Sequence, residues 1–190
     1  MSKISLKIIA GKYKNKRLNL PSKITTRSTK SIIKESLFNT LQFDLIGKNF
    51  VEVFGGSGSI GLEALSRGAK KAYFFEKDKN AFEVLKANCK SIAPSNDFVC
   101  IYGDSFVEFP KFLKNFNEKA FFYLDPPFDI RDGMEDIYNN TIDLILKIPK
   151  TNTHLIIVEH KSGLILPQEI SIYKKIKSKK FGKTTLTYYL

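Results

Sequence analysis

The chain of 190 residues is long enough for one α/β domain with a buried core and too short for two. It carries a net charge of +12 at pH 7, from 31 Lys and Arg against 19 Asp and Glu, which favours a partner rich in phosphate. No run approaches the roughly 20 apolar residues of a membrane span, and the N-terminus lacks the apolar stretch of a secretory signal, so we expect a cytoplasmic protein that binds no membrane.

The first part of the chain is basic: residues 1–34 hold ten Lys or Arg and no acid. Short apolar pairs alternate there with basic residues around Gly11 and Asn15, which predicts a basic β-hairpin over 1–24 that extends a main domain over 25–190. Such a hairpin suits phosphate groups, although only four of the 31 basic residues are Arg, so a solvated lysine-rich face is the alternative. The residues expected to contact nucleic acid are Lys12, Tyr13, Lys14, Lys16 and Arg17.

Helical and strand patterns alternate along the rest of the chain. Apolar residues at helical spacing predict helices over 29–41, 60–67, 80–90, 105–116 and 137–147. Apolar runs predict strands over 50–54, 71–75, 98–102, 120–124, 155–160, 172–179 and 184–190. This order predicts an α/β fold with a doubly wound, mostly parallel sheet of seven strands, one of them antiparallel.

Two smaller features complete this reading of the chain. Residues 170–190 carry six Lys and no acid, so positive charge lies at both ends of the sequence. Cys89 and Cys100 have neither CxxC spacing nor a nearby His. We therefore expect reduced core thiols and no metal site.

A glycine-rich loop follows the first strand of the predicted sheet. Gly56, Gly58 and Gly61 form GxGxxG between a strand and a helix, where backbone without side chains can approach a ligand closely. This context indicates a nucleotide-like cofactor. The residues of the loop expected to bind it are Glu52, Phe54, Gly56, Ser57, Gly58 and Gly61.

Acidic residues end the next two strands. Glu76 lies twenty residues after Gly56, at the place from which an acid bonds the ribose hydroxyls of an adenosine cofactor. Asp104 ends the third strand and can accept a hydrogen bond from an adenine amino group. Its alternative role is an ordinary helix N-cap.

The segment Leu124-Asp125-Pro126-Pro127-Phe128 forms a rigid corner after a wholly apolar strand. Each Pro lacks an N–H and biases the preceding residue toward an extended conformation, so the strand must stop at Asp125. The corner offers a carboxylate, free carbonyls and an aromatic ring, a set that suits a planar amine. The alternative is a plain turn with Phe128 packed into the core. A hydride-transfer enzyme would need a second substrate domain, and none is visible, so the corner favours methyl transfer.

The chain resembles the class I S-adenosylmethionine-dependent methyltransferases and, more narrowly, the bacterial 16S ribosomal RNA guanine-N2 methyltransferases. The resemblance runs nearly end to end, and it departs from the family at Glu52, Gly55 and Ser28, where Asp, Ala and Pro are usual. The matching segments are Ile8–Tyr13, Thr26–Thr29, Lys34–Asn39, the glycine loop, Gly61–Ala69, Asp125–Phe128, Glu159-His160 and Phe181–Thr184.

The resemblance implies a Rossmann-like fold and transfer of a methyl group to N2 of a guanine in 16S rRNA, naked or within a partly assembled small subunit. Asp125 and the Pro126 carbonyl would accept hydrogen bonds from the amine, and either Asp125 or water takes the proton. Asp125 is also expected among the cofactor-binding residues. Phe128 would stack on the base, flipped out of any helix. Pro127 completes the motif.

Three further residues are candidate substrate contacts, each with a structural alternative. Arg27 and Glu35 lie near the substrate or form a surface pair. His160 contacts RNA or is structural.

Three other functions stay open at this stage. The Asp-Pro-Pro-Phe motif also serves adenine-N6 transfer on RNA or DNA. A non-catalytic RNA-binding or assembly protein would keep the fold alone, and the intact glycines and Asp125 argue against it. A nicotinamide dehydrogenase is the third alternative.

Overall fold

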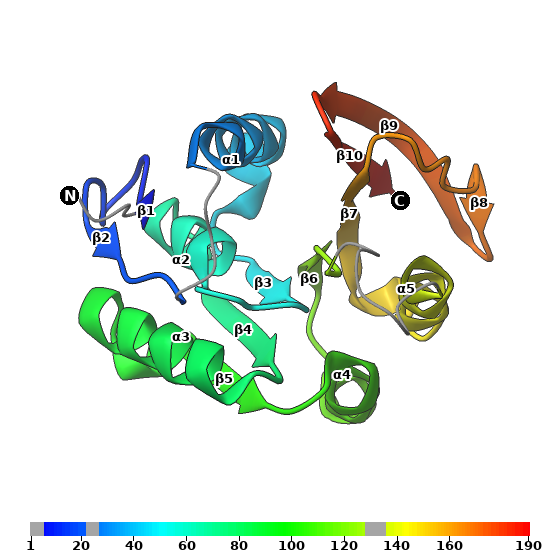
Figure 1. Cartoon of the computed structure of the whole chain (residues 1–190). Helices are drawn as coiled ribbons and strands as arrows, with labels where there is room; N and C mark the ends of the chain where they lie inside the picture. The colour runs from blue at the N-terminus through cyan, green and yellow to red at the C-terminus, as the bar shows by residue number, and fades with distance from the viewer. Residues whose placement is uncertain (1–5, 22–26, 128–135) are drawn as a thin grey trace.

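The computed structural model describes residues 6–21, 27–127 and 136–190. Its centre is an eight-stranded sheet in the order β5-β4-β3-β6-β7-β10-β9-β8 (Figure 1). The strands are β3 (Asn49–Glu52), β4 (Lys71–Glu76), β5 (Phe98–Tyr102), β6 (Ala120–Leu124), β7 (Thr153–Lys161), β8 (Glu169–Ile170), β9 (Tyr173–Phe181) and β10 (Thr184–Tyr189). The first five in the order are parallel, so their carboxyl ends meet at one edge, called the carboxyl edge below.

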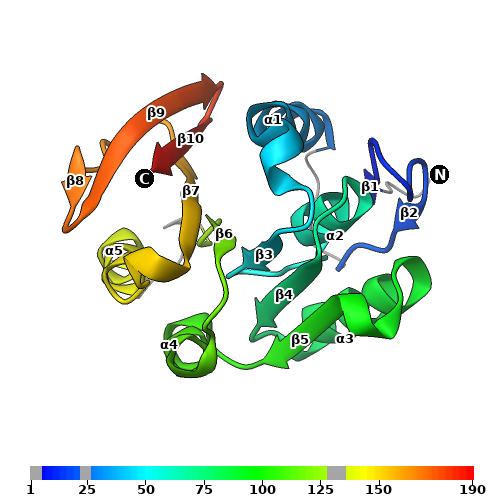
Figure 2. The same ribbon diagram turned by 180° about the vertical axis from the view of Figure 1, so that it is seen from behind.

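Helices cover both faces of the sheet, as Figures 1 and 2 show from opposite sides. One face packs against α1 (Arg27–Leu41), α2 (Ser59–Ser66) and α3 (Lys79–Ile92), and the other against α4 (Ser105–Asn115) and α5 (Ile137–Leu146). Neighbouring residues of β3 serve different cores: Phe50 joins the first cluster and Val51 the second. Because both faces are covered, the parallel strands read as continuous apolar runs.

The predicted doubly wound, mostly parallel sheet is confirmed. All seven expected strands form, and the turn between β9 and β10 lies where predicted, with Thr184 opposite Phe181. A further strand, β8, extends the edge through pairs with the start of β9. Two residues leave no alternating pattern to find, which is why the sequence did not predict it.

The expected basic hairpin also forms, from β1 (Leu6–Lys7) and β2 (Arg17–Leu18). It is not a free arm. Leu6, Ile8 and Leu18 are buried in the same cluster as α1 and α2, so the hairpin shares the core of the main domain.

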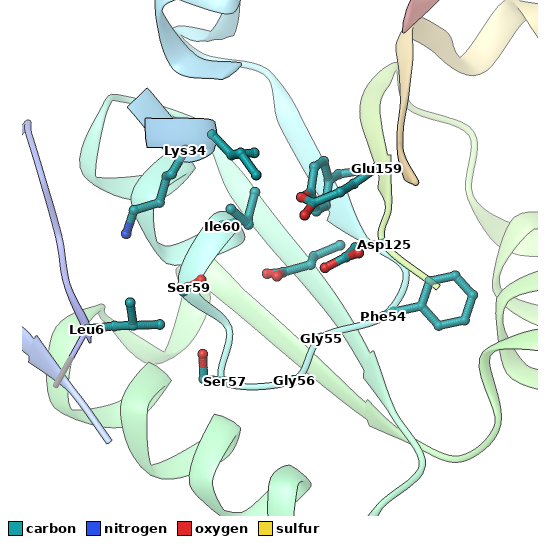
Figure 3. A pocket seen from close by; sticks show the side chains of 13 residues that line it. Leu6, Lys34, Phe54, Gly55, Gly56, Ser57, Ser59, Ile60, Asp125 and Glu159 are labelled. Atoms are coloured by element: carbon teal, nitrogen blue, oxygen red, sulfur yellow. The ribbon is translucent and has the colours of Figure 1, made fainter. Parts of the chain in front are cut away.

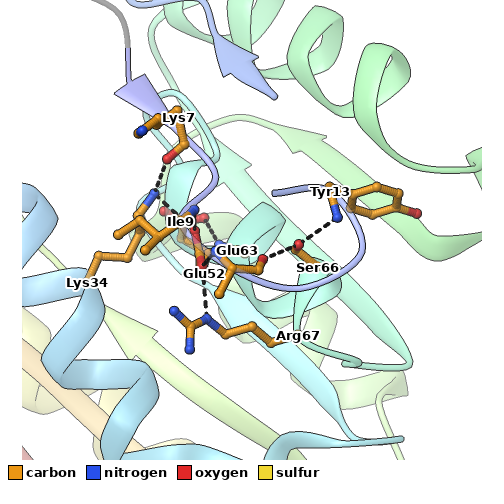
Figure 4. A network of polar contacts seen from close by, with 10 residues as sticks. Lys7, Ile9, Tyr13, Lys34, Glu52, Glu63, Ser66 and Arg67 are labelled. Carbon is orange, nitrogen blue, oxygen red and sulfur yellow. Dashed lines mark hydrogen bonds and ion pairs between the residues drawn. The ribbon is translucent and has the colours of Figure 1, made fainter. Parts of the chain in front are cut away.

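The hairpin lies along α2, as Figure 4 shows. The N–H groups of Ile9 and Ala10 donate to the Glu63 carboxylate at 2.8 and 3.0 Å, and Lys12 N–H donates to the Ser66 carbonyl at 2.8 Å. Since α2 starts at the glycine loop and runs back toward the amino ends of the strands, this contact places the tip of the hairpin at that opposite edge. Lys12 forms an ion pair with Asp97 there, just before β5 begins.

Every helix within the described residues is too short or too polar to cross a membrane.

Candidate active site

Two cavities open at the carboxyl edge and share Phe54, Gly56 and Asp125. The first is lined further by glycine-loop residues, Tyr123 and Glu159. Figure 3 shows Asp125 and Glu159 on one side of this first cavity and Leu6 and Lys34 on the other. The second lies over the ends of β4 and β5, and its walls include Glu76, Asp104 and Phe106.

The Glu76 carboxylate accepts one hydrogen bond from the glycine loop and a second from the turn that follows β4. Glu76 accepts from Gly56 N–H at 2.8 Å and from Asp78 N–H at 2.8 Å. Gly56 has φ +53°, in the left-handed region that favours glycine, and a side chain there would meet nothing within 4 Å. Gly61 is required by packing instead, because a Cβ would lie 2.3 Å from the Phe74 ring. The loop is thereby open on the cavity side and closed against β4.

Glu52 lies beneath the same loop, 3% exposed, and accepts from Gly61 N–H at 2.8 Å. Burial, against the hydrogen bonds from the Gly61 and Ile60 N–H groups and with a contribution from nearby Asp125, raises the pKa of Glu52 to about 8. The side chain therefore braces the start of α2 and lines the first cavity as a neutral acid at pH 7.

The second cavity combines acids with aromatic rings. Asp104 caps α4 by accepting from Phe106 N–H at 3.0 Å, and its other oxygen lies 3.5 Å from Lys77 Nζ. The helix-cap role is thus present, in a residue that also lines the cavity. Phe54 and Phe106 lie with ring centroids 5.5 Å apart. The sequence reading missed Phe106, although a ring two residues after a strand-end acid was available as a signal.

The Asp-Pro-Pro corner follows β6 directly. Asp125 lines both cavities, and Pro127 lines the second, so this corner lies where the two cavities meet. Phe128 falls outside the described residues.

The inner wall of the first cavity is a buried pair that no motif predicted. The Tyr123 hydroxyl donates to the Glu159 carboxylate, joining β6 to β7. Burial, reinforced by the Glu159 charge, raises the pKa of Tyr123 well above its usual range, so the phenol keeps its proton. The hydrogen bond from Tyr123 therefore holds the Glu159 carboxylate in place beside Asp125.

His160 lies apart from both cavities. It is 2% exposed, with Nε2 2.8 Å from Thr187 Oγ1 and Nδ1 3.0 Å from the Lys161 carbonyl. Burial lowers its pKa. Both ring nitrogens have partners within the protein, which indicates a structural role. This placement gives no support to the RNA contact considered for His160.

Of the other expected RNA contacts, Arg27 begins α1, and its side chain falls outside the described residues. Glu35 is exposed on the same helix. The hairpin residues lie toward the opposite edge of the sheet. The structure thus gathers the predicted cofactor residues and Asp125 at one edge and separates the hairpin tip from them.

Comparisons with known proteins bear on the family and the fold. The family model described as "Conserved hypothetical protein 95" matches residues 6–190. The ribosomal RNA small subunit methyltransferase D of Buchnera aphidicola subsp. Baizongia pistaciae is 34% identical over 93% of this chain and 88% of its own. A solved candidate methylase from Haemophilus influenzae is 29% identical over 98% of each chain, with a TM-score of 0.71. A more distant candidate methyltransferase, solved with S-adenosylhomocysteine (SAH), shares the fold: 13% identical, TM-score 0.65, over 94% of this chain and 52% of that one.

Proposed function

This chain belongs to the family described as Conserved hypothetical protein 95, and from that membership we propose that it transfers a methyl group from S-adenosylmethionine to N2 of a guanine in 16S ribosomal RNA. The observation that carries the proposal is the position of Asp125, at the meeting point of two cavities that share the glycine loop. The second cavity suits the cofactor's nucleoside, and the Asp125-Pro126-Pro127 corner can face a target base from the other side.

The residues present fit this cofactor. Glu76 retains acceptor capacity for ribose hydroxyls beside its two N–H donors, because each carboxylate oxygen has two lone pairs. Asp104 can accept from an adenine amino group, and Phe54 and Phe106 offer ring faces to the base. The open space at Gly56 leaves room for the ligand against the loop. Bound there, S-adenosylmethionine would supply a methyl group activated by a sulfonium.

The chain's own part in transfer is orientation and proton removal. The exocyclic amine of guanine has its lone pair spread into the ring. Hydrogen bonds from that amine to the Asp125 carboxylate and the Pro126 carbonyl would localise the lone pair and aim it. Asp125, or water beside it, would take the departing proton. Phe128, the next residue of the motif, would stack on the flipped base.

Methyl transfer can be tested directly with radiolabelled S-adenosylmethionine and small ribosomal subunits from a strain that lacks the endogenous enzyme, followed by nucleoside analysis. Label in N2-methylguanosine is the expected result. Label in N6-methyladenosine would keep the reaction and replace the base. Cofactor binding with no label on either subunits or naked 16S rRNA would favour the non-catalytic RNA-binding role.

The raised pKa of Glu52 predicts how cofactor affinity depends on pH. The positive charge of S-adenosylmethionine, bound in the cavity that Glu52 lines, would favour the ionised carboxylate. Cofactor binding would therefore release a proton from Glu52 below about pH 8, where the ligand-free side chain is protonated. The Kd of Glu52→Gln divided by that of the wild type should therefore rise as the pH increases from 6 to 8. Titration calorimetry at several pH values measures this ratio, which also cancels ionisation of the cofactor itself. A ratio independent of pH would contradict the prediction.

We expect the positive charges of the basic hairpin to contribute to RNA affinity in a salt-dependent way. Replacing Lys12, Lys14, Lys16 and Arg17 with Ala should weaken RNA binding and flatten its salt dependence, by about one unit of log–log slope for each lost phosphate contact. The tip contacts the end of α2, and the glycine loop precedes its start. Because the 8 residues of α2 span about 12 Å, the tip lies about that far from the loop. We therefore expect kcat at saturating RNA to stay unchanged. Filter binding across a salt series measures the slope, and an unchanged slope would make the hairpin a solvated face.

A further inference from the structure

The turn between β9 and β10 lies at the carboxyl edge, beside the proposed site. Thr184 pairs with Lys161 at the end of β7, and Ser162 N–H donates to the Lys183 carbonyl at 2.9 Å. The hydroxyls of Ser162 and Thr185 lie 2.9 Å apart. In sheet order β10 and β9 are two and three strands from β6, and the turn lies two to three residues beyond the level of Asp125, so the two are about 12 to 18 Å apart.

The turn presents positive charge on a fixed support. Lys179, Lys180 and Lys183 are exposed, and residues 170–190 contain no acid. Lys179 Nζ lies 2.8 Å from Ser36 Oγ of α1 and 5.3 Å from the Phe181 ring centroid, which holds this end of β9 against α1 (Figures 1 and 2). None of the ion pairs found among the described residues involves these three lysines.

The other half of the same edge is acidic. Glu76 ends β4, Asp78 follows it and Asp104 follows β5, and Lys77 is paired with Asp104 at 3.5 Å. Asp125 lies at the middle of the edge. The exposed side chains named here are therefore mainly acidic in the cofactor half of the edge and basic at the β9–β10 turn, which favours a phosphate backbone at the turn.

We propose that the β9–β10 turn is a phosphate-binding surface that holds the RNA backbone next to the target nucleotide, on the side of Asp125 away from the cofactor. The inference rests on the proposed function and says on which side of Asp125 the RNA substrate lies. RNA lies over β7, β10 and β9, with Lys180 and Lys183 on its phosphates, while the flipped base reaches back to Asp125. Such contacts position RNA without reading its sequence.

The test compares two double variants with equal loss of charge. Lys180→Ala/Lys183→Ala removes the exposed lysines of the turn and leaves Lys179 on Ser36. Lys114→Ala/Lys147→Ala is the matched control, because both lysines are exposed at the ends of α4 and α5, on the opposite edge of the sheet. Fluorescence anisotropy with a labelled 16S rRNA fragment across 50 to 200 mM KCl, without cofactor, gives the slope of log affinity against log salt.

We expect the turn variant to lose about two units of slope, about one per lysine, and the control to keep the wild-type slope. In methyl transfer the turn variant should raise the KM for RNA and keep kcat. Equal slopes for the two variants would overturn the inference. Binding to phosphatidylserine vesicles that needs the two lysines, with RNA affinity unchanged, would overturn it in favour of a lipid surface.

This test separates the inference from the proposed function. A wild type that binds RNA with the expected slope but transfers no methyl group refutes the function and leaves the phosphate surface standing. A wild type that methylates RNA, with a turn variant indistinguishable in KM and slope, refutes the surface alone.

Discussion

Asp125→Asn should lower methyl transfer by about 100- to 10 000-fold while cofactor affinity stays within a few-fold, the range expected when a positioned carboxylate is lost. Asparagine keeps the shape of the corner and one acceptor oxygen but removes the negative charge that localises the amine's lone pair and accepts its proton. The cofactor's nucleoside would still find Glu76, held by the Gly56 and Asp78 N–H groups, and Asp104, held by Phe106 N–H. Single-turnover transfer and calorimetric cofactor binding measure the two effects separately.

The matched control is Asp143→Asn, which removes an exposed carboxylate from α5 and should leave both quantities unchanged. If Asp125→Asn lost cofactor binding and transfer together, Asp125 would hold the loop rather than act on the base. If it retained full transfer, water would be the proton acceptor and the Pro126 carbonyl the orienting group.

The fold, and the meeting of the expected cofactor residues at one edge of the sheet, could be predicted from the sequence because local rules determine them. The apolar run Ala120–Leu124 is a strand buried on both faces, and Asp125 must follow it where two prolines end the ladder. The glycine loop and Glu76 then meet Asp125 because parallel strands end at one edge. The family resemblance drawn from these motifs is confirmed by the match over residues 6–190.

What the sequence did not reveal depends on contacts between distant residues. Tyr123 and Glu159 are 36 positions apart and form a pair only because β6 and β7 are neighbours. The basic residues of the hairpin were expected at the RNA surface, yet the direction of the hairpin is set by its contacts with α2. Glu63 belongs to a sequence typical of a helix and gives no sign that its side chain is fully buried.

Glu63→Ala should destabilise the fold by about 3 to 5 kcal/mol, the cost of breaking a buried ion pair from one side. The carboxylate is 0% exposed and lies 3.3 Å from Lys34 Nζ and 2.9 Å from Arg67 Nε, and it also accepts from Ile9 and Ala10 N–H. Without it, Lys34 is left charged at 2% exposure, and among the described residues only the Lys7 carbonyl still accepts a hydrogen bond from its Nζ. Urea unfolding measures the loss. Glu169→Ala, which removes an exposed partner of Lys174, should leave the midpoint unchanged.

The double variant Glu63→Ala/Lys34→Met distinguishes the ion pair from the hairpin contacts. Burial already lowers the pKa of Lys34, against the charge of Glu63, so a neutral side chain of similar length relieves the unpaired cation. If the pair dominates, the double variant should recover more than half of the loss. If the backbone bonds to Ile9 and Ala10 dominate, it should recover little, and residues 8–10 should become sensitive to proteolysis in both variants. A loss of unfolding free energy below about 1 kcal/mol for Glu63→Ala would contradict both the ion-pair and the backbone-bond explanations. It would mean that the buried Leu6, Ile8 and Leu18 alone hold the hairpin beside the first cavity.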